Sequence, residues 1–195
     1  MVASGAQIAW LCVLPGPHVA TMVDAALDGG LHVIVEKPWL CSAPVTRSLA
    51  SRARAMQRVV AIHYEYCLLD EVQKWRATLF PGTGFAFGGH FLLNRSDHTG
   101  LPAMDNLGTH LLAIRAYTVP HSAVVEVRCG YEQPDERCVW LERRQARAAF
   151  IDLLATKELI IQRFFAQFEA AANGAECPLD LIFALEVAEG VDALL

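Results

Sequence analysis

The sequence has no apolar run that approaches the ~18 residues needed to cross a membrane. Its N-terminal residues lack the basic segment that opens a signal peptide. Positive charge is also scarce: the formal net charge is −5, and arginines are densest only at 47–58 and 143–147. We therefore expect a cytoplasmic protein that binds neither a membrane nor a nucleic acid, since both favour basic surfaces.

Metal-binding spacings are absent as well. The six cysteines form no Cys-x-x-Cys pair. His90, His98 and His121 do not combine into a ligand set. The sequence therefore predicts no metal site, and it predicts buried, reduced thiols of the kind found in a reducing compartment.

The composition is that of a compact globular chain. Hydrophobic residues make up 54% and charged residues 19%, which argues against disorder. The length of 195 residues suits one domain, or two small ones. A chain of this size buries roughly 70% of its unfolded surface, so it needs no disulfide or metal to fold.

The first part of the chain predicts a βαβ unit. Ile8–Leu14 is a continuous apolar run, typical of a buried parallel strand, and Pro15-Gly-Pro17 ends it. Apolar residues then recur at helical spacing over His18–Asp28, which Gly29-Gly30 closes. His32–Glu36 is a second short apolar run. A strand, a helix and a strand within about 30 residues predict two parallel strands joined by a right-handed crossover.

The rest of the chain predicts further helices and strands. The expected strands are 58–64, 85–94, 124–129 and 138–141. The expected helices are 42–56, 68–79, 104–117, 158–172 and 180–194. Residues 147–154 fit a helix and a strand equally well.

Three segments resemble the Gfo/Idh/MocA family (glucose–fructose oxidoreductase, inositol dehydrogenase and relatives). The run from Leu14-Pro-Gly-Pro-His18 to Glu36-Lys37-Pro38 matches the family's Pro-rich loop, helix and strand ending in Glu-Lys-Pro. Asn106-Leu-Gly-Thr-His110 is similar to the family's Asp-x-x-x-His helix start, and Phe165–Leu195 is similar to its closing helix pair.

This resemblance implies an α/β fold in two parts. A partial Rossmann-like parallel sheet would occupy residues 1–66, as a dinucleotide-binding type of domain. A reduced α+β domain with a small, mostly antiparallel sheet would occupy residues 67–195 and serve substrate binding and oligomerisation.

The resemblance also implies which residues act. In the family the lysine of Glu-Lys-Pro contacts both substrate and cofactor, which implies a catalytic role for Lys37. His110 would carry the proton that accompanies hydride transfer. The implied contacts with NAD or NADP are Leu14, Pro15, Pro17, His18, Glu36, Lys37 and Pro38. The implied contacts with the substrate are Tyr64, Asp105 and Asn106.

The sequence departs from the family pattern in two respects. Family members begin with a strand and a Gly-x-Gly-x-x-Gly turn that holds the pyrophosphate at a helix N-terminus, whereas this sequence starts at what would be the fourth strand. The glycines of 82–88 have the wrong spacing and precede a predicted strand. Asn106 stands where the family has Asp, and an amide cannot exchange a proton near neutral pH.

These patterns leave three functions open. The first is an oxidoreductase that acts on a sugar-like or cyclic small molecule with NAD or NADP, with Lys37 and His110 positioning the substrate and moving the proton. The second is a cofactor-independent isomerase, cyclase or dehydratase, and the third is a non-catalytic partner subunit. Half of a doubly wound sheet would expose an edge near Ile8–Leu14, so we expect a homodimer or a partner subunit to cover it.

Overall fold

A computed structural model describes residues 5–79, 84–154 and 157–194. The chain forms two compact units, each described by itself below. Unit 1 comprises Met1–Tyr64 and Arg163–Glu189, and unit 2 comprises Glu65–Gln162 and Gly190–Leu195. The sequence-based domains, 1–66 and 67–195, differ from these units in two respects: residues 65–66 belong to unit 2, and the segment 163–189 returns to unit 1. No helix of the described ranges is long and apolar enough to cross a membrane.

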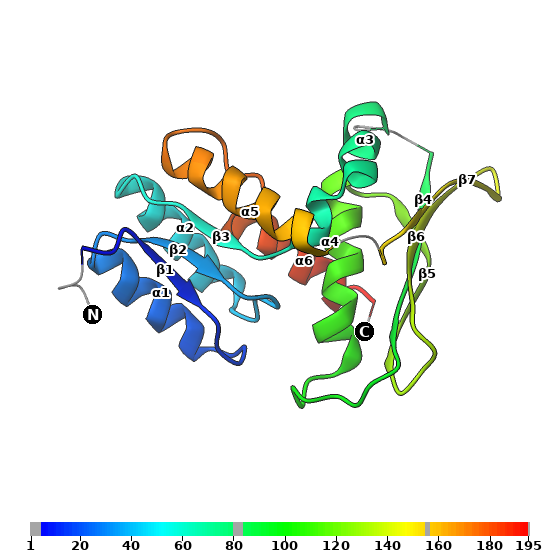
Figure 1. Ribbon diagram of the computed structural model, residues 1–195, viewed down its shortest axis with the longest axis horizontal. Coiled ribbons are helices and arrows are strands. Elements are labelled where there is room, and N and C mark those ends of the chain that lie inside the picture. Colours follow the sequence, from blue (N-terminus) through cyan, green and yellow to red (C-terminus); the bar gives the residue numbers. More distant parts are fainter. Residues whose placement is uncertain (1–4, 80–83, 155–156, 195) are drawn as a thin grey trace. The chain divides into compact units, whose positions relative to one another are not determined.

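Unit 1 is built on a parallel three-stranded sheet in the order β1-β2-β3 (Figure 1). Its strands are β1 (Ile8–Leu11), β2 (His32–Val35) and β3 (Val60–Ile62). Helix α1 (His18–Asp28) joins the first two strands, and α2 (Ala43–Ala55) joins the second to the third. The predicted βαβ unit is therefore confirmed. Its register pairs Ile8 with His32 and Leu11 with Val35, so all the strands end at the same edge.

The predicted burial of the first strand is wrong. Ile8 and Trp10 are 46% and 43% exposed, because β1 pairs with β2 on one side and with no other described strand. The opposite edge of the sheet is covered: Ile62 N–H donates to the Leu179 carbonyl at 2.9 Å. An apolar run alone cannot distinguish a central strand from an edge strand, since burial depends on what lies beside it.

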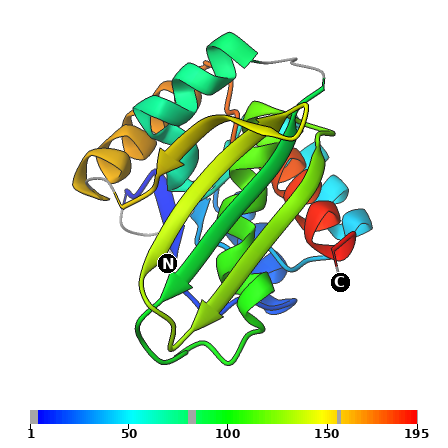
Figure 2. The same cartoon turned by 90° about the vertical axis from the view of Figure 1, so that its right-hand side faces the viewer.

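Unit 2 contains a four-stranded sheet in the order β5-β4-β6-β7, which Figure 2 shows face-on with α4 behind it. Its strands are β4 (Ala86–Leu93), β5 (Ala123–Tyr131), β6 (Glu136–Arg143) and β7 (Ala146–Asp152). Only β4 and β5 run parallel, so the predicted mostly antiparallel sheet is confirmed. The ambiguous segment 147–154 is a strand over most of its length.

The helices of unit 2 begin less regularly than predicted. A 3-10 helix (Glu65–Leu68) precedes α3 (Asp70–Leu79), and a π-helix (Met104–Gly108) precedes α4 (Thr109–Thr118). A Cβ at Gly108 would lie 2.4 Å from Met104 Sδ, so the Met104 side chain packs closely over this glycine. The last helices, α5 (Lys157–Ala172) and α6 (Leu181–Asp192), lie mostly in unit 1 and follow the predicted ranges closely.

The thiols are buried less uniformly than predicted. All six cysteines are free, but Cys12 is exposed, which corrects the expectation of buried thiols at that position. Burial raises the pKa of Cys129 to about 12 and that of Cys177 to about 11. These two thiols are therefore protonated, and unreactive as nucleophiles, near neutral pH.

Two consecutive glycines of β4 let side chains pack on both faces of the sheet. A Cβ at Gly89 would lie 2.9 Å from Leu111 of α4, so this residue faces the helix. A Cβ at Gly88 would lie 2.2 Å from Trp140 Cε2, so the indole of Trp140 covers Gly88 on the outer face. The sheet is thus packed against α4 inside and carries a buried tryptophan outside.

Gly88→Ala tests this packing. Trp140 is buried and donates from Nε1 to Glu142 at 3.0 Å, so its ring has little room to move away from an added methyl group. We expect the free energy of unfolding to fall by about 1–3 kcal/mol, the usual cost of overpacking. Chemical denaturation measures the change.

Gly190→Ala is the matched control. A Cβ there stays 3.8 Å from its nearest neighbours, within α6. Alanine should therefore raise stability by up to about 1 kcal/mol through helix propensity alone. Unchanged stability in Gly88→Ala would contradict the close approach of Trp140.

Candidate functional site

The predicted motif Glu36-Lys37-Pro38 follows β2 at the carboxyl edge of the parallel sheet, where α/β proteins bind ligands. The Lys37–Pro38 peptide bond is cis. Glu36 Oε1 accepts a hydrogen bond from Trp10 Nε1 at 3.1 Å, and His63 Nδ1 lies 3.1 Å from the same oxygen. One carboxylate therefore ties together the ends of all three strands of the sheet.

Aromatic rings from α5 support this carboxylate. The imidazole of His63 packs edge-on against Phe164 with 4.5 Å between ring centroids, and the indole of Trp10 packs edge-on against Phe165 at 5.1 Å. Trp10 and His63 also meet each other edge-on at 5.8 Å. The phenylalanine rings therefore restrict the positions of Trp10 and His63, the two groups that contact the Glu36 carboxylate next to Lys37.

The exit from β2 is anchored by a buried hydrogen bond. Trp39 Nε1 donates to Thr46 Oγ1 at 2.8 Å, and Thr46 Oγ1 donates to the Ser42 carbonyl at 2.9 Å. Both side chains are buried. Because Trp39 lies two residues after Lys37, this contact restricts the backbone that presents the lysine.

The loop after β1 ends at the same edge of the sheet. Leu14, Pro17 and His18 are exposed, and Pro15 is half-buried. Pro17 is the N-cap residue of α1, and a Cβ at Gly16 would lie 3.0 Å from the imidazole of His18. The loop therefore presents apolar surface together with a histidine ring that covers Gly16.

Tyr64, predicted to touch substrate, lies in the interior of unit 1. Its ring is only 1% exposed and packs edge-on against Phe183 at 5.9 Å. This position suits a residue that supports the end of β3.

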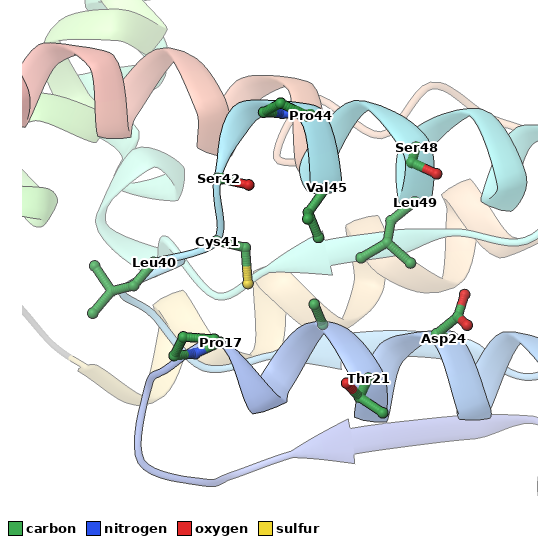
Figure 3. A pocket seen from close by; sticks show the side chains of 11 residues that line it. Pro17, Thr21, Asp24, Leu40, Cys41, Ser42, Pro44, Val45, Ser48 and Leu49 are labelled. Carbon is green, nitrogen blue, oxygen red and sulfur yellow. The ribbon is translucent and has the colours of Figure 1, made fainter.

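A surface groove of about 850 Å³ lies between α1 and α2 (Figure 3). Its lining residues come from α1 and from the chain that leads into and through α2. They are Pro17, Ala20, Thr21, Asp24, Leu40, Cys41, Ser42, Pro44, Val45, Ser48 and Leu49. Of the predicted site residues only Pro17 borders it, so the groove is separate from the Glu36 network.

In unit 2 the predicted catalytic histidine lies in an aromatic enclosure. The imidazole of His110 stacks on Phe91 with 4.9 Å between centroids and an angle of 13°. Tyr66 packs edge-on against it, also at 4.9 Å. The Arg137 guanidinium lies 5.6 Å from the centre of the Phe91 ring, on which His110 stacks. Burial raises the pKa of Tyr66, the other ring in contact with His110. His110 is therefore a buried ring with a fixed orientation.

Asn106 is also buried and already bonded within unit 2. Its Nδ2 donates to the Tyr131 hydroxyl and, at 3.3 Å, to Thr99 Oγ1. Thr99 in turn donates to Asp97, and these bonds lower the pKa of the Asp97 carboxyl. Asp105, next to Asn106, is half-buried. Asn106 thus joins the loop before the π-helix to the end of β5.

Unit 1 brings the predicted Glu36, Lys37 and Pro38 to one sheet edge, and unit 2 places Asp105, Asn106 and His110 on one continuous helical segment. Sequence reasoning missed Trp10. A signal for it existed, because residue 10 precedes the predicted Pro-rich loop on a strand parallel to the one that carries Glu36.

The sequence matches no family profile and no curated protein. Solved structures do share its fold. UDP-N-acetylglucosamine 3-dehydrogenase from Acidithiobacillus ferrooxidans is 13% identical with a TM-score of 0.80, over 96% of this chain and 77% of that one. An inositol dehydrogenase homolog from Azotobacter vinelandii, complexed with NADH and myo-inositol, is 15% identical with a TM-score of 0.69, over 97% and 75%. A 3-ketoreductase from Actinomadura kijaniata, in complex with NADP and TDP-benzene, is 14% identical with a TM-score of 0.69, over 96% and 77%.

At these identities the likeness establishes the fold. The chain has the mixed α/β architecture of these oxidoreductases, with a parallel sheet followed by a mostly antiparallel one. The fold class predicted from the sequence is therefore confirmed.

Thr46→Val tests the anchor behind Lys37. The substitution leaves the buried Trp39 N–H without its acceptor, so we expect the free energy of unfolding to fall by about 1–3 kcal/mol. Thr46→Ser keeps the hydroxyl and should lose less. Thr78→Val is the surface control, since Thr78 is exposed on α3; an equal loss in both valine variants would contradict the buried hydrogen bond.

Proposed function

We propose that this chain is an oxidoreductase of the Gfo/Idh/MocA type that acts on a sugar-like or cyclic small molecule with NAD or NADP. The observation that carries the proposal is the place of Lys37, directly after a parallel strand at the ligand-binding edge of an α/β sheet. The shared fold supports the cofactor, since two of the similar structures contain NADH or NADP.

In this proposal Lys37 holds a substrate hydroxyl and moves its proton. A lysine ammonium offers three hydrogen-bond donors that hold the substrate oxygen, and it can donate a proton to that oxygen when a carbonyl is reduced. In the oxidative direction the neutral amine accepts the proton of the substrate hydroxyl. Glu36 is fixed by Trp10 and His63, and Trp39 is fixed by Thr46. The backbone on both sides of Lys37 is thus anchored, as positioning a reacting group requires.

The same edge suits the nicotinamide end of a dinucleotide. Leu14 and Pro17 present apolar surface, and His18 is exposed beside them. Within the described ranges no glycine-rich turn joins a strand to a helix to cradle a pyrophosphate. A bound nicotinamide would supply or accept the hydride, while the residues of this chain orient the substrate and move the proton.

For His110 we propose a proton-carrying role, argued separately from that of Lys37. Its ring is held by Phe91 and Tyr66, and a fixed imidazole suits directional proton transfer. Asn106 and Asp105 are its proposed partners for the substrate.

Titration with NADH and NADPH tests the redox proposal. We expect saturable one-to-one binding of at least one nucleotide, followed by nicotinamide fluorescence. Lys37→Gln keeps a polar side chain but removes the ammonium. It should weaken binding about tenfold or more, since a hydrogen bond to a charged group contributes roughly 1.5–3 kcal/mol.

Lys74→Gln is the matched control, because Lys74 is exposed on α3. Its affinity should equal that of the wild type. Absence of binding of either nucleotide by the wild type would contradict the redox proposal, and equal affinities in the two variants would remove Lys37 from the site.

A second candidate is a subunit that works against another polypeptide, and the open edge of unit 1 favours it. Ile8 and Trp10 are exposed on β1, and no charged residue precedes Asp24 in the sequence. Charged side chains are the usual protection of an open strand edge. We propose that a second copy of the chain pairs along β1.

Ile8→Lys tests this pairing by adding a charge to the edge. We expect the wild type to have the mass of a dimer by light scattering and the variant to have that of a monomer. Val125→Lys is the control, since Val125 is 48% exposed on β5, the edge of the other sheet. A monomeric wild type, or a dimer that survives Ile8→Lys, would contradict the pairing along β1.

A further inference from the structure

A compact set of ligand-type side chains lies on the four-stranded sheet of unit 2. His90 on β4 is in register with Cys138 on β6, and Glu136 lies two residues before Cys138 on the same strand. One ligand atom from each lies within 4.8 Å of the others. His90 Nδ1 is 2.8 Å from Glu136 Oε1, and Cys138 Sγ is 3.6 Å from the same oxygen.

These side chains lie on the outer face of the sheet. Gly89 faces Leu111 of α4, and Val139 packs beside it on that inner face. Successive residues of a strand point to opposite faces, so His90 and Cys138 point away from α4. This is the face turned toward the viewer in Figure 2.

Glu126 of β5 completes the arrangement. Its Oε1 lies 3.3 Å from His90 Nε2. The side chain of His90 is only 12% exposed. Nε2 has no aligned hydrogen bond among the described residues. In metal sites the second ring nitrogen of a ligating histidine usually donates to such a carboxylate, which fixes the ring. Trp140 also restrains the imidazole, edge-on at 5.0 Å.

We propose that His90 Nδ1, Glu136 and Cys138 bind a divalent transition-metal ion of the zinc type, with Glu126 orienting His90. Zn²⁺ takes nitrogen, oxygen and sulfur ligands at about 2.0–2.3 Å, whereas Mg²⁺ and Ca²⁺ select oxygen. Such bonds separate tetrahedral ligand atoms by roughly 3.3–3.8 Å, so shifts of about 1 Å among these side chains would bring the three ligand atoms to coordinating distances. Sequence spacing predicted no metal site because it reveals only ligands that lie close together in the chain, whereas His90 on β4 meets Glu136 and Cys138 on β6 only through strand pairing.

The site is independent of the proposed oxidoreductase function, because none of the residues assigned to that function belongs to it. Three protein ligands leave one position of a tetrahedral ion for water or another ligand. Three protein ligands and one open place are common to zinc sites that bind a further ligand.

Metal binding releases protons here. The proton between His90 Nδ1 and Glu136 must leave, and so must the thiol proton of Cys138. Burial and the charge of Glu136 raise the pKa of Cys138, whereas the hydrogen bond from His90 lowers the pKa of Glu136. Binding of a metal by this thiol therefore requires that its proton leave. The positive charges of Arg128 near Glu136 and of Arg147 near Cys138 stabilise the deprotonated ligands. The same charges repel a bound divalent cation.

Titration of the whole chain with Co²⁺ tests the site, because cobalt occupies zinc sites and shows a near-ultraviolet absorption band when a thiolate binds it. We expect one Co²⁺ per chain, a thiolate band, and displacement by Zn²⁺. Cys138→Ser should remove the band and weaken Zn²⁺ binding at least tenfold against a chromophoric chelator. Cys12→Ser is the matched control, since Cys12 is an exposed thiol in unit 1, and it should retain both properties.

Glu126→Gln tests the orienting carboxylate. The thiolate band should remain while Zn²⁺ affinity falls about 10–100-fold, the usual effect of losing such a partner. Thermal melting of the metal-free variants checks folding. Glu136→Gln, at a half-exposed position, is the second ligand variant should Cys138→Ser fail to fold, and it should keep the band at reduced affinity.

Three results would overturn the site. They are absence of one-to-one binding by the wild type, a cobalt spectrum without a thiolate band, and loss of that band in Cys12→Ser. Each would leave His90 as an imidazole that lies between the carboxylates of Glu126 and Glu136 without binding a metal.

Discussion

The carboxylate of Glu36 is the contact on which the candidate site of unit 1 depends. It receives Trp10 from β1 and His63 from the end of β3 while it belongs to the end of β2 itself. A single acceptor thus sets the relative position of three strand ends, and the rings of Phe164 and Phe165 hold its donors. Lys37 follows this anchored residue directly, so its backbone inherits the constraint. Glu36 therefore supports the backbone that leads into Lys37, the residue for which a ligand-binding role is proposed.

Unit 2 depends on a different constraint, the absence of side chains at two neighbouring positions of β4. Gly89 gives room to Leu111 on the inner face, and Gly88 gives room to Trp140 on the outer face. The Trp140 ring then packs edge-on against His90 and covers the backbone of β4 at Gly88. One pair of glycines therefore determines both how α4 packs on the sheet and where the imidazole of the outer face lies.

Local patterns predicted the elements well, and their environments poorly. The βαβ unit and the closing helices follow from periodicity, glycine stops and proline breaks, which act between residues close in sequence. The π-helix does not follow from them, and neither does the close packing of Met104 over Gly108. The grouping of His90 with Glu136 is equally invisible, since its partners lie 46 residues apart and meet only through strand pairing. The Glu36 network could be foreseen in part, because parallel strands end together, but the indole of Trp10 could not be assigned to it without the register.

The wrong prediction that β1 is buried shows how an apolar strand can lie at the edge of a sheet. Ile8–Leu11 has the composition of a central strand, and no charged residue stands near it in the sequence, yet it occupies an edge. Edge strands that must remain open are ordinarily protected by charged residues, proline or bulges. The opposite edge of the same sheet is covered by Leu179 and Asp180. Among the described residues, β1 is therefore the edge of this sheet with no neighbouring strand. Composition and position agree with the proposed pairing of a second copy of the chain along β1. In that proposal the paired strand would lie beside the strand that leads into the loop 14–18, at whose end of the sheet Lys37 is also found.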